Sequence, residues 1–484
     1  MTNNSTNDSG PKRRVLFRVL LTPVALLAGG IAVGALTGRL PLMLTITAFA
    51  GGLALLLTVL RPDMALILFF CGTIMMTDAF GLSGKDCFTI PDADIIQGLP
   101  SALTIFFLLL FCIAMARTLF FEKRPLPVSL RGLGVYIVIL LLALLTGLFR
   151  ASDPGMIRVD LMKMLFPVLC FYLCITLLNN RERIKRMLMV LLAASALKAL
   201  ILDGFYLAGR GWPYDSMTGR IVTLDSADLL AFITLTLIAV HLLARRDIRG
   251  FQAGLVGAAC IPMIFAIIFS YRRAQWAGMA LSMGLLYLGA EQAVRRRIVI
   301  VVVIVLCIGG TVAVANGINK ENLVRIGSRI ATIFDPNQHS NLHHKLEAQQ
   351  VMQDISRSPL LGLGFGSQHG GVAHYDSIPT NVVHNTFLYI WMKLGLPGMV
   401  FFLWASFLYG KNILRARKKY LHDETWGLLL PLAASSGLWL TMFLTSPIPW
   451  YLHQTFFKAL VAAMVMSLIL QADKNAKTQL EAGT

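Results

Sequence analysis

His384 is the residue whose type and position best suit proton transfer. It lies in Asn381-Val382-Val383-His384-Asn385, directly before an apolar run. Imidazole titrates near neutral pH, and positive neighbours or a helix N-terminus keep it neutral and able to accept a proton. A histidine taken alone is more often an ordinary polar residue. The arginines expected on the same side of the molecule favour a role as general base.

Arginines stand before several apolar runs. Arg220 and Arg273 each precede a predicted helix. The free N–H groups and the dipole of a helix N-terminus favour anions, and arginine adds bidentate hydrogen bonds, which suits phosphate or diphosphate recognition. The other arginines predicted on this side are Arg150, Arg158, Arg210, Arg272, Arg325 and Arg329. Any one of them could simply reach lipid headgroups, but as a set they indicate an anion site.

Histidines also cluster between residues 339 and 347. His339, His343 and Glu347 are four residues apart, and on a helix this spacing could bind zinc. The residues directly before them, Asp335-Pro336-Asn337-Gln338, favour a helix that begins no earlier than Asn341. Histidines in such a loop are usually polar surface, so we predict no metal site and no cofactor.

The elements that must hold these residues are membrane helices. The 484 residues are 56% apolar and only 14% charged, whereas soluble domains are about one-quarter charged. Apolar runs recur at 15–36, 40–60, 98–116, 133–149, 187–208, 252–270, 297–315, 398–410 and 454–471. They are continuous and do not alternate, which excludes a membrane β-barrel. We predict an all-α polytopic membrane protein with about 14 spans, in the range of about 12 to 14.

The net charge of +18 comes from short basic clusters between apolar runs. This distribution is a topology signal, and it argues against a nucleic-acid partner. When the helices are counted in order, the clusters, among them 181–186, all fall on one side, which the positive-inside rule makes the cytoplasmic side. Both termini are therefore expected in the cytoplasm. The predicted order is a cytoplasmic tail at 1–14, a helix bundle at 15–315, a large outward loop at 316–383, further spans at 384–471 and a cytoplasmic tail at 472–484.

The large outward loop is expected to contain two helices, Glu321 to Ile333 and Leu342 to Ser356. The glycine-rich stretch 358–366 ends the second helix and lacks the lysine of a nucleotide loop, so we predict a tight turn against neighbouring helices. Gly395-Leu396-Pro397-Gly398 should interrupt the helix that follows His384. Residues 384–394 would then lie along the outer interface before the chain turns inward.

Several of these stretches resemble the O-antigen ligase and polymerase superfamily of membrane glycosyltransferases. Residues 358–366, 384–388 and 395–398 are similar to the family's proline-leucine-glycine stretch, its histidine-asparagine motif and its trailing glycines. Tyr271-Arg272-Arg273 and Gly219-Arg220-Ile221 resemble the arginines that members carry at the outer starts of helices. The chain departs from the family at Leu224-Asp225-Ser226, where an asparagine is frequent, and at His344 and Ala348, where the loop helix often offers arginine and tryptophan.

The resemblance implies a GT-C-like fold and a reaction. A glycan on a polyprenyl (undecaprenyl) diphosphate would be transferred to an acceptor hydroxyl at the outer face of the bacterial inner membrane. His384 would deprotonate that hydroxyl, and Arg220 with Arg273 would hold the diphosphate without a metal ion. The substrate-binding residues implied are Arg272, Arg325, Arg329, Asn385 and Arg158.

Other functions stay open. The acceptor could be a glycan, lipid A core or a protein hydroxyl, which makes the enzyme a polymerase, a ligase or a protein O-oligosaccharyltransferase. A transporter of lipid-linked sugars would need ionisable residues at mid-membrane depth. Lys198 and Lys458 are the deep lysines, and the sequence reveals no acidic partner for either. A metal hydrolase built on the loop histidines is the third alternative.

Overall fold

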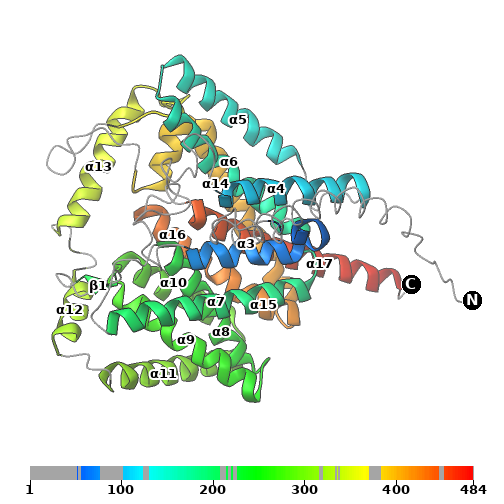
Figure 1. Cartoon of the computed structure of the whole chain (residues 1–484), viewed down its shortest axis with the longest axis vertical. Helices are drawn as coiled ribbons and strands as arrows, with labels where there is room; N and C mark the ends of the chain where they lie inside the picture. Colours follow the sequence, from blue (N-terminus) through cyan, green and yellow to red (C-terminus); the bar gives the residue numbers. More distant parts are fainter. Residues whose placement is uncertain are drawn as a thin grey trace, which may run out of the picture. The chain divides into compact units, whose positions relative to one another are not determined.

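The computed structural model is helical almost throughout the part of the chain that it describes (Figure 1). The described residues are 52, 56–76, 102–123, 130–207, 214–215, 220–221, 226–315, 320–332, 335, 338–369, 383–445 and 452–482. Within them, strands are limited to the antiparallel pair β1 (Tyr214–Asp215) and β2 (Arg220–Ile221). The all-α prediction is confirmed.

The chain forms two compact units. The first, Met1–Phe69 with Ala102–Pro125, contains most of α3 (Pro62–Met76), α4 (Ala102–Ala116) and the π-helix η2 (Arg117–Phe121). The aromatic ring of Phe69 contacts Phe106 and Phe107, at 6.3 and 5.6 Å between ring centres.

The second unit, Phe70–Ser101 with Leu126–Thr484, carries the rest of the described helices. They are α5 (Leu130–Phe149), α6 (Pro154–Leu177), α7 (Arg181–Leu207), α8 (Ser226–Arg245), α9 (Gly250–Phe269), α10 (Arg273–Gly289), α11 (Gln292–Ala315), α12 (Lys320–Ala331), α13 (His339–Ser356), α14 (Thr386–Tyr420), α15 (Glu424–Ala434), α16 (Ser436–Thr445) and α17 (Leu452–Ala482).

Nine spans among the described residues are long and apolar enough to cross a membrane. They are Thr104–Phe121, Gly132–Phe149, Pro154–Leu177, Arg181–Gly204, Asp228–Arg245, Gly250–Phe269, Thr386–Tyr420, Glu424–Thr445 and Gln454–Glu481. The protein is therefore a multi-pass membrane protein. The count of about 14 stays a prediction, because the runs predicted at 15–36 and 40–60 lie largely outside the described residues.

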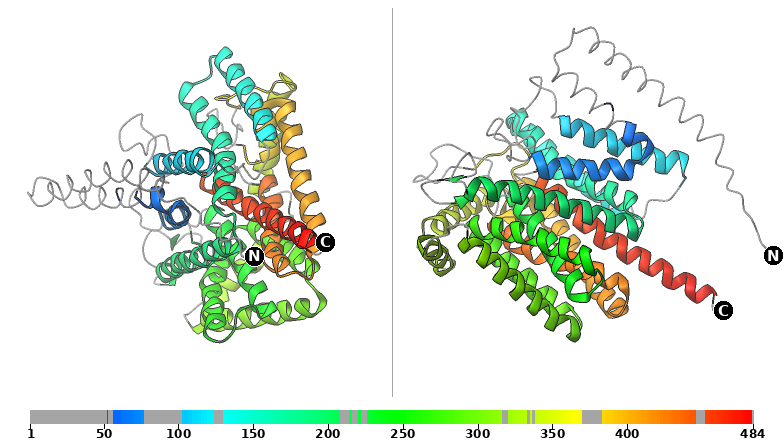
Figure 2. Two further views of the ribbon diagram at one scale, coloured as in Figure 1. Left: turned by 90° about the vertical axis from the view of Figure 1, so that its right-hand side faces the viewer. Right: turned by 60° about the horizontal axis from the view of Figure 1, so that its bottom comes forward.

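Helix α8 is the core of the second unit, since almost all its side chains are buried. It packs against α7, α9, α11 and α15 (Figure 2), while α10 packs on α16 and α17 packs on α6. Small residues allow close approach between membrane helices. A Cβ added to Gly278 would lie 2.4 Å from a methyl group of Leu438 and 3.1 Å from its Cα, so a larger residue would require α16 to shift or repack.

Lys198 corrects one prediction from the sequence. Its Nζ lies 2.8 Å from Oδ1 of Asp228, and both side chains are buried. The expectation that Lys198 lacks an acidic partner is wrong, because the carboxylate comes from the first turn of the next helix, α8. An opposite charge at this distance offsets much of the cost of burying the ammonium group.

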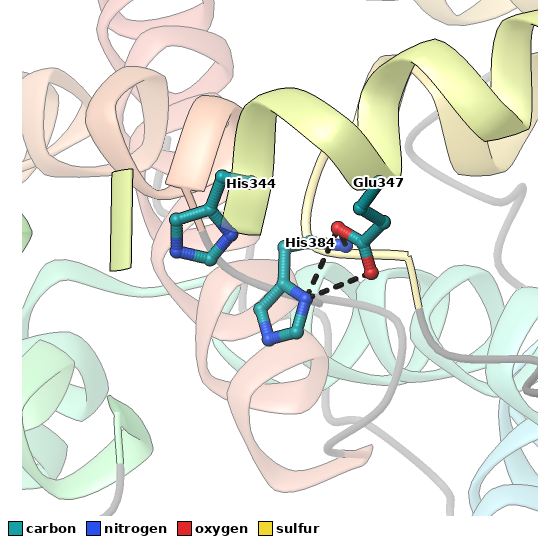
Figure 3. A group of neighbouring side chains, drawn as sticks. All are labelled: His344, Glu347 and His384. Carbon is teal, nitrogen blue, oxygen red and sulfur yellow. Dashed lines mark hydrogen bonds and ion pairs between the residues drawn. The ribbon is translucent and has the colours of Figure 1, made fainter. Parts of the chain in front are cut away.

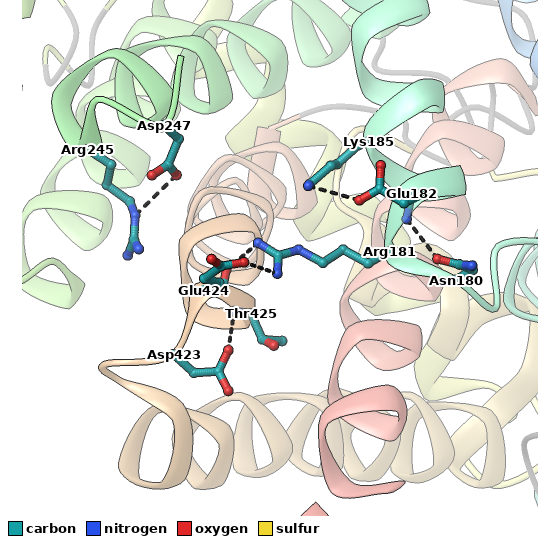
Figure 4. A network of polar contacts seen from close by, with 9 residues as sticks. All are labelled: Asn180, Arg181, Glu182, Lys185, Arg245, Asp247, Asp423, Glu424 and Thr425. Carbon is teal, nitrogen blue, oxygen red and sulfur yellow. Dashed lines mark hydrogen bonds and ion pairs between the residues drawn. The ribbon is translucent and has the colours of Figure 1, made fainter. Parts of the chain in front are cut away.

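The ends of α7 and α15 carry an exposed polar network (Figure 4). Nη1 of Arg181 lies 2.6 Å from Oε2 of Glu424 and links the two helices. Arg181 belongs to one of the basic clusters predicted to face the cytoplasm. Exposed ion pairs of this kind contribute about 0–1 kcal/mol, so this one contributes little to the stability of the bundle.

The glycine-rich stretch after α13 is the tight turn that the sequence predicts. Gly362, Gly364 and Gly366 have φ of 73°, 84° and 77°, which side chains with a Cβ rarely adopt. A Cβ on Gly362 would lie 2.5 Å from the backbone nitrogen of Gly395, and one on Gly364 would lie 2.4 Å from that of Gly147. The stretch, called the glycine turn below (358–366), thus sits directly against the backbones of α14 and α5.

The segment predicted as a large loop and the end of the chain agree with the sequence prediction in part. Helices α12 and α13 match the two predicted loop helices, although α13 begins at His339 and not at Asn341. Gly395 has φ 66° and ψ −167°, so the predicted interruption of α14 is confirmed. Helix α17 continues to Ala482 through the predicted tail at 472–484.

Candidate active site

His384 and Glu347 form the centre of the candidate site. His384 stands just before α14, and Glu347 lies in the middle of α13. The His384 Nδ1 atom lies 3.0 Å from Oε1 and 3.1 Å from Oε2 of Glu347 (Figure 3). The backbone N–H of His384 also donates to Oε2, at 3.0 Å. One carboxylate therefore fixes both the backbone and the ring of this histidine.

The two partners differ in exposure. The Glu347 side chain is 5% exposed and that of His384 is 30% exposed. Burial raises the pKa of the Glu347 carboxyl, but hydrogen bonds and electrostatic attraction from His384 together outweigh burial, so this pKa is lowered from its usual value. The carboxylate is thus ionised at neutral pH and can accept a hydrogen bond from a protonated Nδ1.

This contact selects one tautomer of His384. With the proton on Nδ1 and donated to the carboxylate, Nε2 keeps a free lone pair. Figure 3 shows the second ring nitrogen of His384 directed away from Glu347. The arrangement matches a general base whose ring is oriented by an acid, in which Nε2 receives the proton.

Three further histidines surround the pair. The rings of His344 and His343 lie 4.7 and 5.8 Å from the ring of His384, measured between ring centres. Burial, with a smaller contribution from His384, lowers the pKa of His344 to about 4. The buried His369 places Nε2 4.0 Å from Oε1 of Glu347. His344 is therefore neutral at pH 7 and adds no competing positive charge.

His344, Glu347 and His384 could also hold a metal ion, since one ligand atom from each lies within 4.8 Å of the others. The sequence suggested a different set, His339 with His343 and Glu347. His384 comes from another element, so helical spacing could not indicate it. The side chain of His339 lies outside the described residues. A neutral His344 and an ionised Glu347 are suitable ligands for zinc.

Arg273 begins α10, as the sequence predicts. Its guanidinium donates to the carbonyl oxygen of Thr332 at 2.5 Å, to Oε1 of Gln338, and to Oδ1 of Asn341 at 3.4 Å. These acceptors are neutral, and the carboxylate of Asp335, which acts electrostatically on Arg273, offsets its positive charge only in part because Arg329 acts in the opposite sense. The charge acts electrostatically on His344, whose ring lies beside that of the base. Arg273 therefore holds the start of α13 and faces the histidine cluster.

The structure describes the side chains of some of the other predicted site residues but not of all. Arg329 lies on α12 and acts electrostatically on Arg273, and Arg272 is the half-buried residue that precedes α10. Arg325 lies on α12 and Arg220 in β2, but their side chains lie outside the described residues. Arg158 is exposed near the start of α6, and the contacts described for His384 and Arg273 do not include it.

Asn385 explains why α14 begins where it does. Its Oδ1 accepts hydrogen bonds from the backbone nitrogens of Phe387 at 3.0 Å and Leu388 at 3.2 Å. An asparagine N-cap satisfies N–H groups that have no partner within the helix. The neighbouring His384 is thus held at the first turn of α14 by its own chain as well as by Glu347.

A buried ion pair between α6 and α14 was not predicted from the sequence. Nζ of Lys393 lies 2.7 Å from Oδ2 of Asp160, and both side chains are 0% exposed. The Tyr389 hydroxyl donates to Oδ1 of Asp160 at 2.7 Å, and the Gly366 N–H donates to Oδ2 at 2.8 Å. Lys393 also donates to the carbonyl of Ser367. This cluster, the Asp160 network, ties α6 and the glycine turn to the first half of α14.

Glu347 is the candidate site residue that the sequence did not pair with His384. It was considered only as a metal ligand, because its partner lies 37 residues away in the chain. One signal was available. His343 and His344 precede Glu347 by four and three residues. On a helix this spacing places all three side chains on one face, which indicates that this face contacts other polar groups.

Residues 258–403 match the family model described as O-Antigen ligase. No curated protein matches the chain. The matched segment runs from α9 into α14 and contains Arg273, Glu347 and His384, whereas Arg220 and Asp160 lie before it. The resemblance stated from the motifs is confirmed for this segment, and it supports a lipid-linked glycan ligase or polymerase type of role.

Proposed function

We propose that the protein transfers an oligo- or polysaccharide from a polyprenyl diphosphate donor to an acceptor hydroxyl, at the outer face of the bacterial inner membrane. The observation that supports this most strongly is the contact between Glu347 and Nδ1 of His384, which leaves Nε2 of a partly exposed imidazole ready to accept a proton. The match to O-Antigen ligase over this segment points the same way.

In the proposed reaction, the acceptor O–H gives its proton to Nε2 of His384 while its oxygen attacks the anomeric carbon. The bond from that carbon to the diphosphate oxygen breaks, and the diphosphate leaves with the electron pair. Attack from the opposite side inverts the configuration. Arg273, aided by Arg220, Arg272, Arg325 or Arg329, stabilises the charge on the leaving group, and Asn385 and Arg158 complete the substrate-binding set.

The topology that goes with this reaction is also a proposal. Both termini would lie in the cytoplasm, and α12, α13 and the His384 site would face the periplasm. The acceptor would be a growing glycan, lipid A core or a protein hydroxyl. The glycan profile of a deletion strain separates these cases: single repeats on the acceptor indicate a lost polymerase, free lipid-linked polymer a lost ligase, and an unglycosylated protein a lost protein transferase.

The direct test uses the purified full chain with a lipid-linked glycan donor and its acceptor. General bases contribute about 10²–10⁴-fold, so His384→Ala is expected to lower kcat by at least about 100-fold. The matched control is His422→Ala, an exposed histidine beside Glu291, which should transfer glycan at the wild-type rate. Full activity of His384→Ala in protein that elutes and melts like the wild type would refute the assignment of the base.

Metal-dependent hydrolysis is a second candidate, favoured by the ligand geometry of His344, Glu347 and His384. Both reactions lose activity with His384→Ala, so the chelator separates them. The proposed transfer is expected to continue at an unchanged rate after treatment with EDTA. Loss of activity in EDTA and its recovery with zinc would support the metal site and refute metal-independent transfer.

A further inference from the structure

Lys458 is a buried lysine that has no hydrogen-bond partner in the described part of the chain. It lies on α17, its side chain is 8% exposed, and its Nζ makes no hydrogen bond. Gln454, one turn earlier on the same helix, is 0% exposed, and neither its amide oxygen nor its amide nitrogen makes one. Two neighbouring polar groups are thus taken out of water without compensation, which is costly in free energy.

The contact described for Lys458 is too weak to offset this cost. Its Nζ lies 5.0 Å from the centre of the Phe443 ring. The attraction between a cation and an aromatic ring, even out of water, is smaller than the free-energy cost of burying an ammonium group. Loss of the proton would remove the charge but would leave the amine, like the Gln454 amide, without a partner. A bound anion would accept hydrogen bonds from Nζ of Lys458 and from the amide nitrogen of Gln454.

Lys458 is connected to the region of the base by two aromatic contacts. The Phe443 ring lies 6.1 Å from the Phe387 ring, measured between centres. Phe387 is in the first turn of α14, three residues after His384. Helix α14 also packs against both α16 and α17. The hydroxyl of Thr386, in the same first turn, is buried and makes no hydrogen bond either.

We propose that Lys458 and Gln454 form an anion subsite that binds the diphosphate of the lipid-linked donor. The ammonium group and the amide N–H group would donate charge-assisted hydrogen bonds to phosphate oxygens. This inference rests on the proposed function for the identity of the ligand. It places a second group of donors on α17, separate from the arginines of α10 and α12.

The test measures binding of undecaprenyl diphosphate that carries no sugar, by native mass spectrometry of the full chain in phosphatidylcholine nanodiscs. Loss of a charged hydrogen bond is expected to weaken binding by about tenfold or more in Lys458→Met. Lys411→Met, which removes an exposed lysine of α14, is the matched control and should bind like the wild type. Equal binding by Lys458→Met and the wild type would overturn the inference.

Two further arms identify the source of the anion. Phosphatidylglycerol and inorganic diphosphate are added separately to the same nanodiscs. If Lys458→Met weakens binding of phosphatidylglycerol but not that of undecaprenyl diphosphate, the subsite takes a phospholipid headgroup and the inference is wrong. If Lys458→Met weakens binding of inorganic diphosphate but not that of undecaprenyl diphosphate, the inference is also wrong.

Stability distinguishes a binding role from a structural one. Since Lys458→Met removes a buried group that lacks a hydrogen bond, its melting temperature should equal or exceed that of the wild type. A lower melting temperature together with weaker binding in Lys458→Met, but wild-type binding in Gln454→Leu, would assign a structural role and contradict the subsite. Donor binding that depends on Lys458 in a protein that transfers no glycan would refute the proposed function and leave the subsite standing.

Discussion

Two buried carboxylates, Glu347 and Asp160, bind basic side chains at the start of α14, and the two pairs differ in how far the basic partner is exposed. Glu347 binds His384 just before the helix begins, and Asp160 binds Lys393 about two turns further along. Both are buried acids paired with a basic side chain from a distant part of the chain. The basic partner of Glu347 is 30% exposed, whereas that of Asp160 is 0% exposed.

The difference lies in what each pair leaves available. Both oxygens of Asp160 accept hydrogen bonds from inside the protein, and Lys393 is completely enclosed. His384 uses only its Nδ1 side for Glu347 and keeps Nε2 for another partner. An ion pair whose hydrogen-bonding atoms are all occupied can only stabilise the structure. A pair in which one nitrogen keeps a free lone pair can also accept a proton. The comparison implies that variants of the Asp160 pair should change stability and variants of the Glu347 pair should change kcat.

Lys393→Met should give the largest effect. It leaves the Asp160 carboxylate buried without its counter-charge, and breaking such a pair costs about 3–5 kcal/mol. The measurement is the free energy of unfolding in detergent, followed by circular dichroism. A Lys393→Met protein with wild-type stability would break the comparison, because the enclosed pair would then have no structural role.

The double variant Asp160→Asn with Lys393→Met is the matched control for the ion pair. It removes both charges, and the introduced asparagine can still accept the hydrogen bond from Tyr389. Its loss of stability should be smaller than the sum of the two single losses, which a double-mutant cycle measures directly. Lys163 acts electrostatically on both residues. It stays in place in Lys393→Met and offsets part of the Asp160 charge, so the measured coupling energy is expected to lie at the lower end of the range.

Glu347→Gln should give the next largest effect, on turnover. The glutamine oxygen can still accept from the backbone N–H of His384, but the charge that orients and stabilises the imidazolium is lost. We expect kcat to fall by about 100-fold, the lower end of what a general base contributes. KM should stay unchanged, because Glu347 contacts the base and not the donor. A raised KM with normal kcat would assign Glu347 to substrate binding.

The smallest effect concerns pH. Burial lowers the pKa of His344 to about 4 from its usual 6.5. The unfolded chain therefore binds a proton between pH 6.5 and pH 4 that the folded chain does not, and stability should fall as pH decreases through this window. The melting temperature should fall by fewer degrees between about pH 7 and about pH 5 in His344→Gln than in the wild type. Identical pH profiles of melting temperature in the two proteins would contradict the assignment of this pH dependence to His344.

The groups that act on His344 set the size of this effect. Glu347 favours its protonation, whereas His343, His384 and Arg273 oppose it. Because these groups stay in place in His344→Gln, the difference between the two profiles isolates the titration of His344. The enclosed Asp160 network should contribute equally to both.

Local patterns predicted the parts of the site that depend on chain order. Arg273 starts a helix after a short polar turn, His384 precedes an apolar run, and the glycines of 358–366 mark a turn, so each is visible within about ten residues of sequence. The interruption of α14 at Gly395 was visible for the same reason. These features are confirmed by α10, α14 and the glycine turn.

The contacts between acidic residues and their partners could not be predicted, because each contact joins two different helices or loops. Helical periodicity relates only residues within one element. Asp160 and Tyr389 are 229 residues apart, and Glu347 and His384 are 37 apart. Lys198 seemed isolated within its own apolar run, although Asp228 lies one helix later. A single sequence indicates which side chains are costly to bury, but not which one compensates another.

The Asp160 network also sets an order of events during synthesis. Helix α6 leaves the ribosome long before α14, so its carboxylate enters the membrane when Lys393, Tyr389 and Gly366 do not yet exist. Until they arrive, the carboxylate lacks these hydrogen bonds, and the attraction of Lys163 on the same helix offsets part of the cost of placing it in lipid. A nascent chain that stops before residue 393 therefore has a reason to be retained by the insertion machinery or degraded, and assembly of the first half of α14 coincides with the moment when the hydrogen bonds of that acid are completed.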